Sequence, residues 1–283
     1  MTRPPPARTP ALAALALLAA ACSPAPERDP RPLVAVSVVP QEYFVLRIAG
    51  DRVATRVMIP PGASHATWEP GIEQIRAVAS AALYVKVGHP RFPFEETWLE
   101  RLLADRSDLP VVDSSQGNGA AEGDPHPWVT PRHARSMARG IHAALVALMP
   151  GDAAELDANL AALEAEIDRV DAELRQMLAG RRGSTFVVFH PAWGHFASEY
   201  GLVQLAIEDE RKEPGAGRLA RVLAEARRLR APVVFAQPQI DPRGAEVVAA
   251  EIGARLEWLD PLAFDWPENL RRVGRQVAAA ARP

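Results

Sequence analysis

Four residues of this chain have side chains suited to holding a metal ion, and each stands in a loop or at the predicted end of a strand: His65, His126, His190 and Asp260. Neutral imidazole nitrogens and carboxylate oxygens are ligands that a borderline cation such as zinc takes in tetrahedral geometry. Their spacing matches no compact metal motif. The spacing alone therefore does not distinguish a shared metal site from four unrelated residues at the ends of strands.

The surroundings of these residues favour a shared site. His65 lies in the turn-rich loop 60–70, which follows a predicted strand at 54–59, and His190 directly follows a predicted strand at 185–189. Ligands bind at the carboxyl ends of the strands in open α/β sheets. Because Asp260 also follows a short apolar run, all three are expected at such edges.

His126 stands between Pro125 and Pro127, next to Asp124. The two proline rings preset the backbone, which lowers the entropy cost of presenting the imidazole as a ligand. By contrast, His133 and His142 fall within a predicted helix at 131–148, and we expect them to be solvated or packing residues.

One long helix is predicted at 152–178, near the middle of the chain. Its apolar residues recur at alternating steps of four and three, which places them on one helical face: Leu156, Leu160, Leu163, Ile167, Val170, Leu174 and Met177. At roughly 1.5 Å per residue the helix is about 40 Å long. We interpret it as a spine packed along both halves of one molecule, although a dimerising coiled coil also fits the spacing.

Short apolar strands alternate with helical segments on both sides of the spine. The predicted strands span residues 33–39, 54–59, 82–87, 110–113, 185–189, 202–207, 233–236 and 256–259. Helices are predicted at 41–49, 71–79, 131–148, 219–229, 242–252 and 268–281. Strands that alternate with helices favour an α/β fold with parallel sheets. We predict an N-terminal lobe (33–150), the connecting helix (151–180) and a C-terminal lobe (181–283), each lobe a small parallel sheet with helices on both faces and a metal site in the cleft between them.

The start of the chain has the features of an export signal. Residues 1–21 combine two arginines with a short apolar run that is too short to span a membrane. Cys22, the single cysteine, follows Ala19-Ala20-Ala21, which resembles a bacterial lipobox with alanine where leucine is commoner. We predict that residues 1–21 are removed, that Cys22 is lipidated, and that residues 22–32 form an extended tether. A plain cleaved signal is the alternative.

Charge and composition argue against nucleic acid as a partner. The net charge is −3 for the whole chain, becomes −5 without residues 1–21, and the chain has only two lysines, Lys86 and Lys212. The arginines are scattered, so the sequence offers no basic stripe for a phosphate backbone.

Four segments, in this order, resemble the zinc- and manganese-binding substrate-binding proteins of bacterial ABC transporters, the cluster A-I family. They are VSVVPQEYFVLRIAGDRVATRVMIPPGASHATWEP, DPHPWVTPRHARSMARGI, FHPAWGHFASEYGLVQLAI and PVVFAQPQIDPRGAEVVAAEIGARLEWLDPLA. The resemblance implies two α/β lobes joined by one long helix and a single metal bound between them. It implies that His126, His190 and Asp260 are the second, third and fourth ligands.

The first ligand departs from the family pattern. Aligning the loop places Ala66 where the family has histidine and His65 one residue earlier. We expect His65 to be the first ligand, with Glu69, His89 or water as substitutes. His195 is expected to be structural or exposed.

The resemblance also bears on cargo and partners. Manganese binders of the family commonly have a carboxylate as third ligand, so His190 favours zinc as the bound ion, with manganese possible. No histidine-rich loop occurs at 114–123. The expected protein is a lipid-anchored, extracytoplasmic monomer that is not an enzyme and that delivers zinc to a membrane permease and its ATPase. The rivals are a binding protein for another solute and a secreted zinc hydrolase, although the chain has no HExxH motif.

Overall fold

The computed structural model describes residues 29–115, 123–208 and 216–283, and residues 31–283 form one compact unit. The predicted signal sequence and Cys22 lie outside the described residues. No helix in the described part is long and apolar enough to pass through a membrane.

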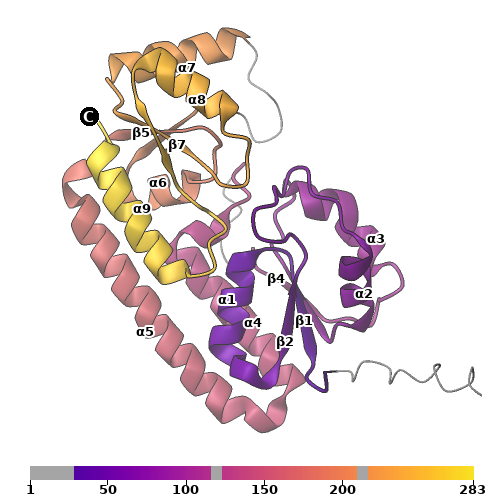
Figure 1. Cartoon of the computed structure of the whole chain (residues 1–283). Helices are drawn as coiled ribbons and strands as arrows, with labels where there is room; N and C mark the ends of the chain where they lie inside the picture. Colours follow the sequence, from indigo (N-terminus) through magenta and orange to yellow (C-terminus); the bar gives the residue numbers. More distant parts are fainter. Residues whose placement is uncertain (1–28, 116–122, 209–215) are drawn as a thin grey trace, which may run out of the picture. The chain divides into compact units, whose positions relative to one another are not determined.

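Two parallel four-stranded sheets form the fold (Figure 1). The first has the order β2-β1-β3-β4 and the second the order β6-β5-β7-β8. The strands are β1 (Leu33–Val36), β2 (Ala54–Val57), β3 (Leu83–Lys86), β4 (Val111–Asp113), β5 (Thr185–Val188), β6 (Val203–Ala206), β7 (Val233–Ala236) and β8 (Arg255–Trp258). The predicted α/β class with two parallel sheets is confirmed.

Nine α-helices occur in the described residues: α1 (Val39–Ala49), α2 (Ile72–Ser80), α3 (Glu100–Leu103), α4 (Pro131–Leu148), α5 (Ala153–Leu178), α6 (Gly194–Tyr200), α7 (Ala216–Arg228), α8 (Arg243–Ile252) and α9 (Trp266–Ala280). A π-helical turn, Glu95–Leu99, leads directly into α3, and a 3₁₀ turn, Pro127–Val129, precedes α4. The helical stretch from Glu95 to Leu103 was not predicted from the sequence.

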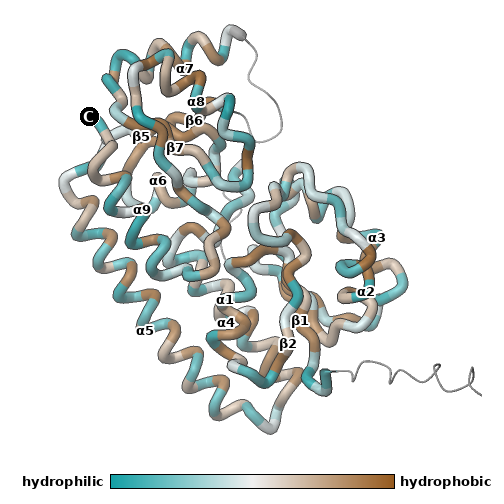
Figure 2. The backbone as a smooth tube through the Cα atoms, viewed as in Figure 1, coloured by the Kyte–Doolittle hydropathy of each residue, from teal (hydrophilic) through white to brown (hydrophobic). Residues whose placement is uncertain are grey.

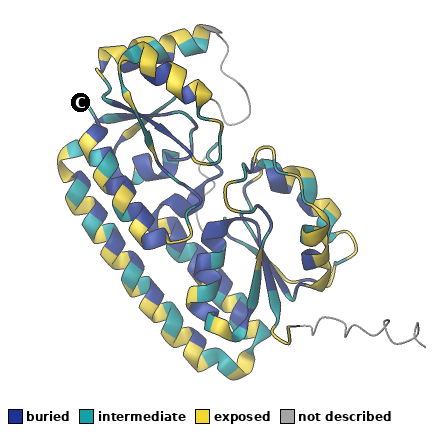
Figure 3. Ribbon diagram, viewed as in Figure 1, coloured by how far each residue is buried: buried dark blue, intermediate teal, exposed yellow. Residues whose placement is uncertain are grey.

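The long helix α5 is the predicted spine. Its buried side chains are Leu156, Leu163, Ile167, Val170, Leu174 and Leu178. They face α1 and α4 from the first half of the chain and α9 from the second. Figure 2 shows apolar and polar residues alternating along α5, and Figure 3 shows the same alternation in burial. Because the apolar face is covered within the chain, this packing supports the spine and not the coiled-coil alternative.

Several predicted strands are too long by one to three residues, and β1 shows why. The strand was predicted to reach residue 39, but it ends at Val36 and α1 begins at Val39. Pro40 suits the first turn of a helix, where its missing N–H costs nothing. The side chain of Gln41 accepts the backbone N–H of Val38 at 3.1 Å, which satisfies a donor at the helix start. A β-branched run therefore gives way to a capped helix.

Most of the buried apolar side chains form one cluster, which includes residues of both sheets, α1, α4, α5 and α9. A smaller cluster on the second sheet involves Val187 and Val234 with Val222 of α7 and Val248 of α8. The larger cluster therefore joins the two sheets to the spine.

Candidate metal centre

Three histidines converge at one point. One ring nitrogen from each of His65, His126 and His190 lies within 4.8 Å of the others, and this is the one group of three or more candidate ligands found among the described residues. The ring centroids are 5.0 Å apart for His65 and His126, 5.7 Å for His65 and His190, and 5.6 Å for His126 and His190. Three imidazoles at this spacing can bind one ion of zinc's size after small side-chain movements.

The three side chains are shielded from solvent, with residue exposures of 7 % for His65, 1 % for His126 and 4 % for His190. Burial, followed by the charges of His126 and His190, holds the pKa of His65 well below its ordinary value. His65 is therefore kept neutral, which is the form that binds a metal.

The loop that carries His65 is built from local turns. Its backbone folds back through hydrogen bonds from Thr67 and Trp68 to the carbonyl oxygen of Ser64, and the indole of Trp68 donates to the carbonyl of Met58 at 2.8 Å. The His65 ring stacks on Phe92, with 5.1 Å between centroids and 18° between planes. Phe92 lies three residues after His89 in the sequence, and its contact with His65 was not predicted.

His126 is oriented by Asp124. The Oδ1 atom of Asp124 lies 2.8 Å from His126 Nδ1 and accepts the backbone N–H of His126 at 3.0 Å. Metal-bound histidines commonly have their second ring nitrogen fixed by a carboxylate in this way. Although burial alone would raise the pKa of Asp124, the hydrogen bond from His126 and the charges of His126 and His195 hold it at about 2. Asp124 is thus ionised, and Nε2 is the nitrogen of His126 that can face the ion.

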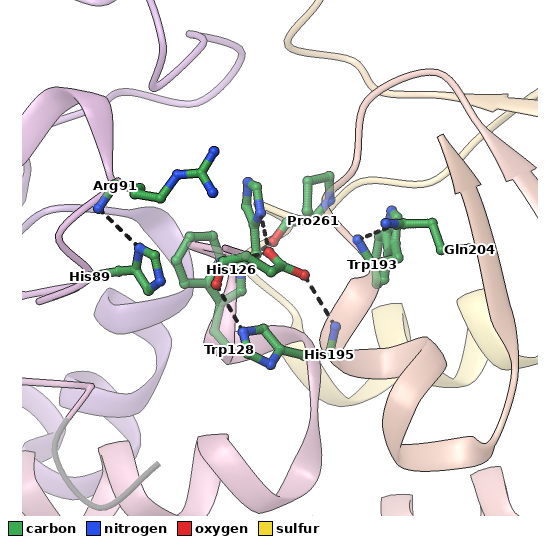
Figure 4. Close-up of polar contacts among 9 residues, drawn as sticks. His89, Arg91, His126, Trp128, Trp193, His195, Gln204 and Pro261 are labelled. Atoms are coloured by element: carbon green, nitrogen blue, oxygen red, sulfur yellow. Dashed lines mark hydrogen bonds and ion pairs between the residues drawn. The ribbon is translucent and has the colours of Figure 1, made fainter. Parts of the chain in front are cut away.

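Asp124 also joins the His126 loop to α6. Its Oδ2 atom accepts the backbone N–H of His195 at 3.1 Å, and His195 Nε2 lies 2.9 Å from the carbonyl oxygen of Asp124. A Cβ atom on Gly194 would stand only 2.6 Å from Oδ2, so glycine is needed there for the carboxylate to approach. Figure 4 shows His195 with these two polar contacts as dashed lines. His195 therefore has a structural role, because it holds Asp124 in place. The ring of His133 packs edge-on against that of His195, with 4.6 Å between ring centroids.

Two tryptophans fix the same loop from the other side. The indole of Trp128 donates to the carbonyl oxygen of Pro261 at 2.7 Å (Figure 4), and the indole of Trp266 donates to the carbonyl oxygen of Trp128 at 2.7 Å. Both indoles are almost completely buried. These contacts between residues more than 130 positions apart were not foreseen from the sequence.

His190 lies two residues after β5. The following turn is fixed by Gln204, whose side-chain oxygen accepts the backbone N–H of Trp193 at 2.7 Å (Figure 4). Glu208 Oε2 lies 3.5 Å from His190 Nδ1. The carboxylate of Glu208 therefore lies near one ring nitrogen of His190, as the carboxylate of Asp124 lies near one ring nitrogen of His126.

The other candidate ligands lie outside the group of three histidines. The carboxylate of Asp260 receives hydrogen bonds from Gln239 Nε2 at 2.7 Å and from the backbone N–H of Leu262 at 2.9 Å, both on Oδ1. His89 is buried, and its Nδ1 accepts the backbone N–H of Arg91 at 3.1 Å (Figure 4). Glu69 is exposed and lines a separate cavity that His65 also borders.

A cavity of about 10 Å³ adjoins His65 and His126. It is lined by Ser64, His65, His126, Gln237, Gln239, Ile240, Pro261 and Leu262. A cavity of this size is about the smallest that can hold one water molecule. The two glutamines were not recognised from the sequence, where neutral amides in a loop give no particular signal.

Comparison with known proteins agrees with this architecture. The chain is 28 % identical over 262 residues to the high-affinity zinc uptake system protein ZnuA of Yersinia pestis, covering 81 % of this chain and 82 % of that protein. A crystal structure of ZnuA superposes with a TM-score of 0.83 at 38 % identity, covering 88 % of this chain and 99 % of the other. A zinc-bound deletion mutant of ZnuA gives a TM-score of 0.83 at 37 % identity, covering 89 % and 99 %.

The model of one protein family, described as the periplasmic component A of the zinc-uptake complex, matches residues 34–279. This range includes both sheets, the spine and all three histidines. The family resemblance inferred from the sequence is confirmed, and the chain belongs to the ZnuA family of periplasmic zinc-uptake components.

Proposed function

We propose that this protein captures a zinc ion outside the cytoplasm with His65, His126 and His190 and delivers it to an ABC-transporter permease driven by an ATPase. The convergence of the three ring nitrogens within 4.8 Å of one another is the observation that carries this proposal. Membership of a zinc-uptake family supports it, as do relatives that are named for high-affinity zinc uptake.

The chemistry of the site favours zinc over manganese. Imidazole suits zinc, whereas manganese prefers carboxylate, carbonyl and water oxygens. Asp260, which the family resemblance predicts as the fourth ligand, is hydrogen-bonded by Gln239 and Leu262, and these two residues line the small cavity. A set of three imidazoles with one remaining position for Asp260 or water is consistent with a zinc site.

Residues 33–150 and 181–283 act as the two lobes that supply the ligands, with 151–180 as their connection. His65 and His126 come from the first range and His190 from the second. An ion bound by all three therefore links the two lobes. Cargo release then requires a movement that separates at least one of these ligands from the others.

The protein acts as a lipid-anchored monomer. The support for the anchor is the sequence Ala19-Ala20-Ala21-Cys22 followed by a proline-rich segment. Labelling with a radioactive fatty acid tests this, because a C22S variant should lose the label and leave the membrane fraction.

Elemental analysis of protein purified without added metal tests the cargo. We expect one zinc per chain, removable by a chelator, with manganese unable to displace it at equal concentration. Assays with ester and peptide substrates should show no turnover. Zinc below one-tenth of an equivalent after reconstitution would contradict the proposal, and zinc-dependent hydrolysis would favour the rival hydrolase.

A further inference from the structure

A second, much larger cavity lies beside Asp124, and none of the three converging histidines lines it. Its volume is about 550 Å³, which is in the range of sites for small organic molecules. Helices α4, α5 and α6 supply most of its wall, with the residues Arg132, His133, Arg175, His195, Ser198 and Glu199. Apart from Gly194, every lining residue is polar or charged. The cavity is therefore suited to a polar molecule, since an apolar one would leave these groups without partners.

Glu199 offers the cavity a carboxylate oxygen. Only 12 % of its side chain is exposed, and its Oε2 atom is buried without a hydrogen-bond partner among the described residues. Nη2 of Arg175 is 3.7 Å from the other oxygen, Oε1. Burial raises the pKa of this carboxyl, and a cationic group on a ligand would offset that effect. Glu199 is thus suited to accept hydrogen bonds from an ammonium group.

Arg132 offers the complementary charge. Its side chain is exposed, and its Nη2 donates to His133 Nε2 at 3.1 Å, which uses one of the five guanidinium N–H groups. The remaining N–H groups can bind a carboxylate, which is the anion that fits the guanidinium fork. Besides burial, which raises the pKa of Glu199, the charge of Arg132 lowers it, so the two side chains lie close to each other. A short ligand can therefore reach both.

The balance of charges in the wall selects among ligand classes. The arginines Arg132 and Arg175 face the carboxylates Asp124 and Glu199. A simple anion would meet the two carboxylates, and a simple cation would meet the two arginines. A divalent metal is not favoured either, because within the described residues three candidate ligand atoms converge at the three-histidine centre and nowhere in this cavity. A molecule with one positive and one negative group fits this balance.

We propose that the cavity binds a free α-amino acid, whose ammonium group bonds to Glu199 and whose carboxylate bonds to Arg132. In an α-amino acid these two groups are joined through one carbon atom, which suits two side chains that lie close together. The polar wall favours a small, neutral, polar side chain such as that of serine. This inference goes beyond zinc capture and does not depend on it, because the three histidines lie outside the cavity wall.

Calorimetric titration of the full-length protein with L-serine tests the inference. We expect saturable binding of one molecule per chain. N-acetyl-L-serine lacks the ammonium group and L-serinamide lacks the carboxylate. Each should bind at least about tenfold more weakly than L-serine, because each loses a hydrogen bond between charged groups.

Two substitutions identify the partners of these groups. E199Q and R132Q should each weaken L-serine binding by about tenfold or more. E173Q and R135Q are the matched controls, because their charged groups form ion pairs outside the cavity, and both should bind L-serine as the wild type does. Arg132 is exposed at the cavity rim, so R132Q provides the test if E199Q folds poorly.

The same derivatives separate a direct contact from a general loosening of the cavity. E199Q should not weaken N-acetyl-L-serine further, and R132Q should not weaken L-serinamide further, because each derivative already lacks the group concerned. A loosened cavity would instead weaken both derivatives in both variants, and that result would contradict the assigned contacts.

Two further results would overturn the inference. One is the absence of saturable L-serine binding by the wild type, or equal binding of L-serine and its two derivatives. The other is tighter binding of inorganic phosphate than of L-serine, weakened in R132Q and strengthened in E199Q, which would make the cavity an anion site. Failure of zinc capture is a separate result, because elemental analysis detects it and L-serine binding does not require it.

Discussion

The two halves of the chain share one strand order but differ in how they are covered and connected. In both sheets the first strand of the half is central, flanked by the second and third. The first sheet packs into the large core with the spine, whereas the second sheet has an additional small core against α7 and α8. The second half thus carries an outer layer that depends less on the spine.

The candidate metal centre contains residues of both halves. The loop with His126 belongs to the first half by sequence, but Asp124 bonds to His195, and Trp128 bonds to Pro261. His65 instead lies in a loop closed by local turns and stacks on Phe92 of its own half. Proximity along the chain is therefore a poor guide to which part of the molecule positions each candidate ligand.

The largest expected effect comes from removing a ligand from either half. H126A and H190A should each abolish tight zinc binding. The loss of zinc affinity should exceed the roughly 100-fold that follows from removing a residue that only hydrogen-bonds to a ligand. Calorimetric titration of the apo protein measures it. H142A is the control, because His142 bonds to Asp157 on the spine and not to the metal centre. Wild-type affinity in H190A would show that His190 is not a ligand.

The next largest effect should distinguish the two cores. Leu163 is completely buried on the spine, and L163A should cost about 2–5 kcal/mol of unfolding free energy for the whole unit. Val248 belongs to the small outer core, so V248A should mainly increase local opening of α7 and α8. Chemical denaturation and amide hydrogen exchange measure the two effects. If both variants lose amide-exchange protection equally along α5, the small core beneath α7 and α8 does not open independently of the large core.

Asp124 offers a smaller effect that tests the link between the halves. D124N retains the shape of the side chain but weakens its bond to His126, so zinc affinity should fall about 10–100-fold. G194A should act in the same direction, since its Cβ would displace Asp124 Oδ2. D168N, at a surface pair with Arg135, is the control. An unchanged affinity in both D124N and G194A would mean that His126 is positioned without the carboxylate.

The sequence predicts the architecture well because the relevant signals are local. The spacing of apolar residues identifies α5, and short apolar runs between turns identify the strands, although their ends are set by details such as the Gln41 cap. The helical stretch Glu95–Leu103, by contrast, was not predicted. Pro93 stands two residues before that stretch. The phenylalanines on either side of it, Phe92 and Phe94, obscure the helical spacing of the apolar residues.

The candidate site is predicted less completely, because its supporting contacts join distant residues. Histidines in rigid loops after strands are visible in the sequence, and they include the three that converge. The engagement of Asp260 by Gln239 and the stacking of His65 on Phe92 depend on side-chain positions set by the fold. The role of Asp124 is partly visible in the sequence, because an aspartate can accept the backbone N–H of the residue two positions later, which here is His126.

The smallest expected effect is on the pH dependence of stability, and it depends on His65 in the first half. Burial and the neighbouring histidines lower the pKa of His65 in the folded state, whereas in the unfolded chain it titrates near 6.5. Below about pH 6.5 the unfolded state therefore binds the extra proton and the folded state does not, so the stability of the metal-free protein should fall as pH decreases. H65Q lacks this group, and its unfolding free energy should decline less between pH 7 and pH 5 than that of the wild type. Urea denaturation with a chelator present measures both slopes, and parallel slopes would show that the folded site does not keep His65 neutral.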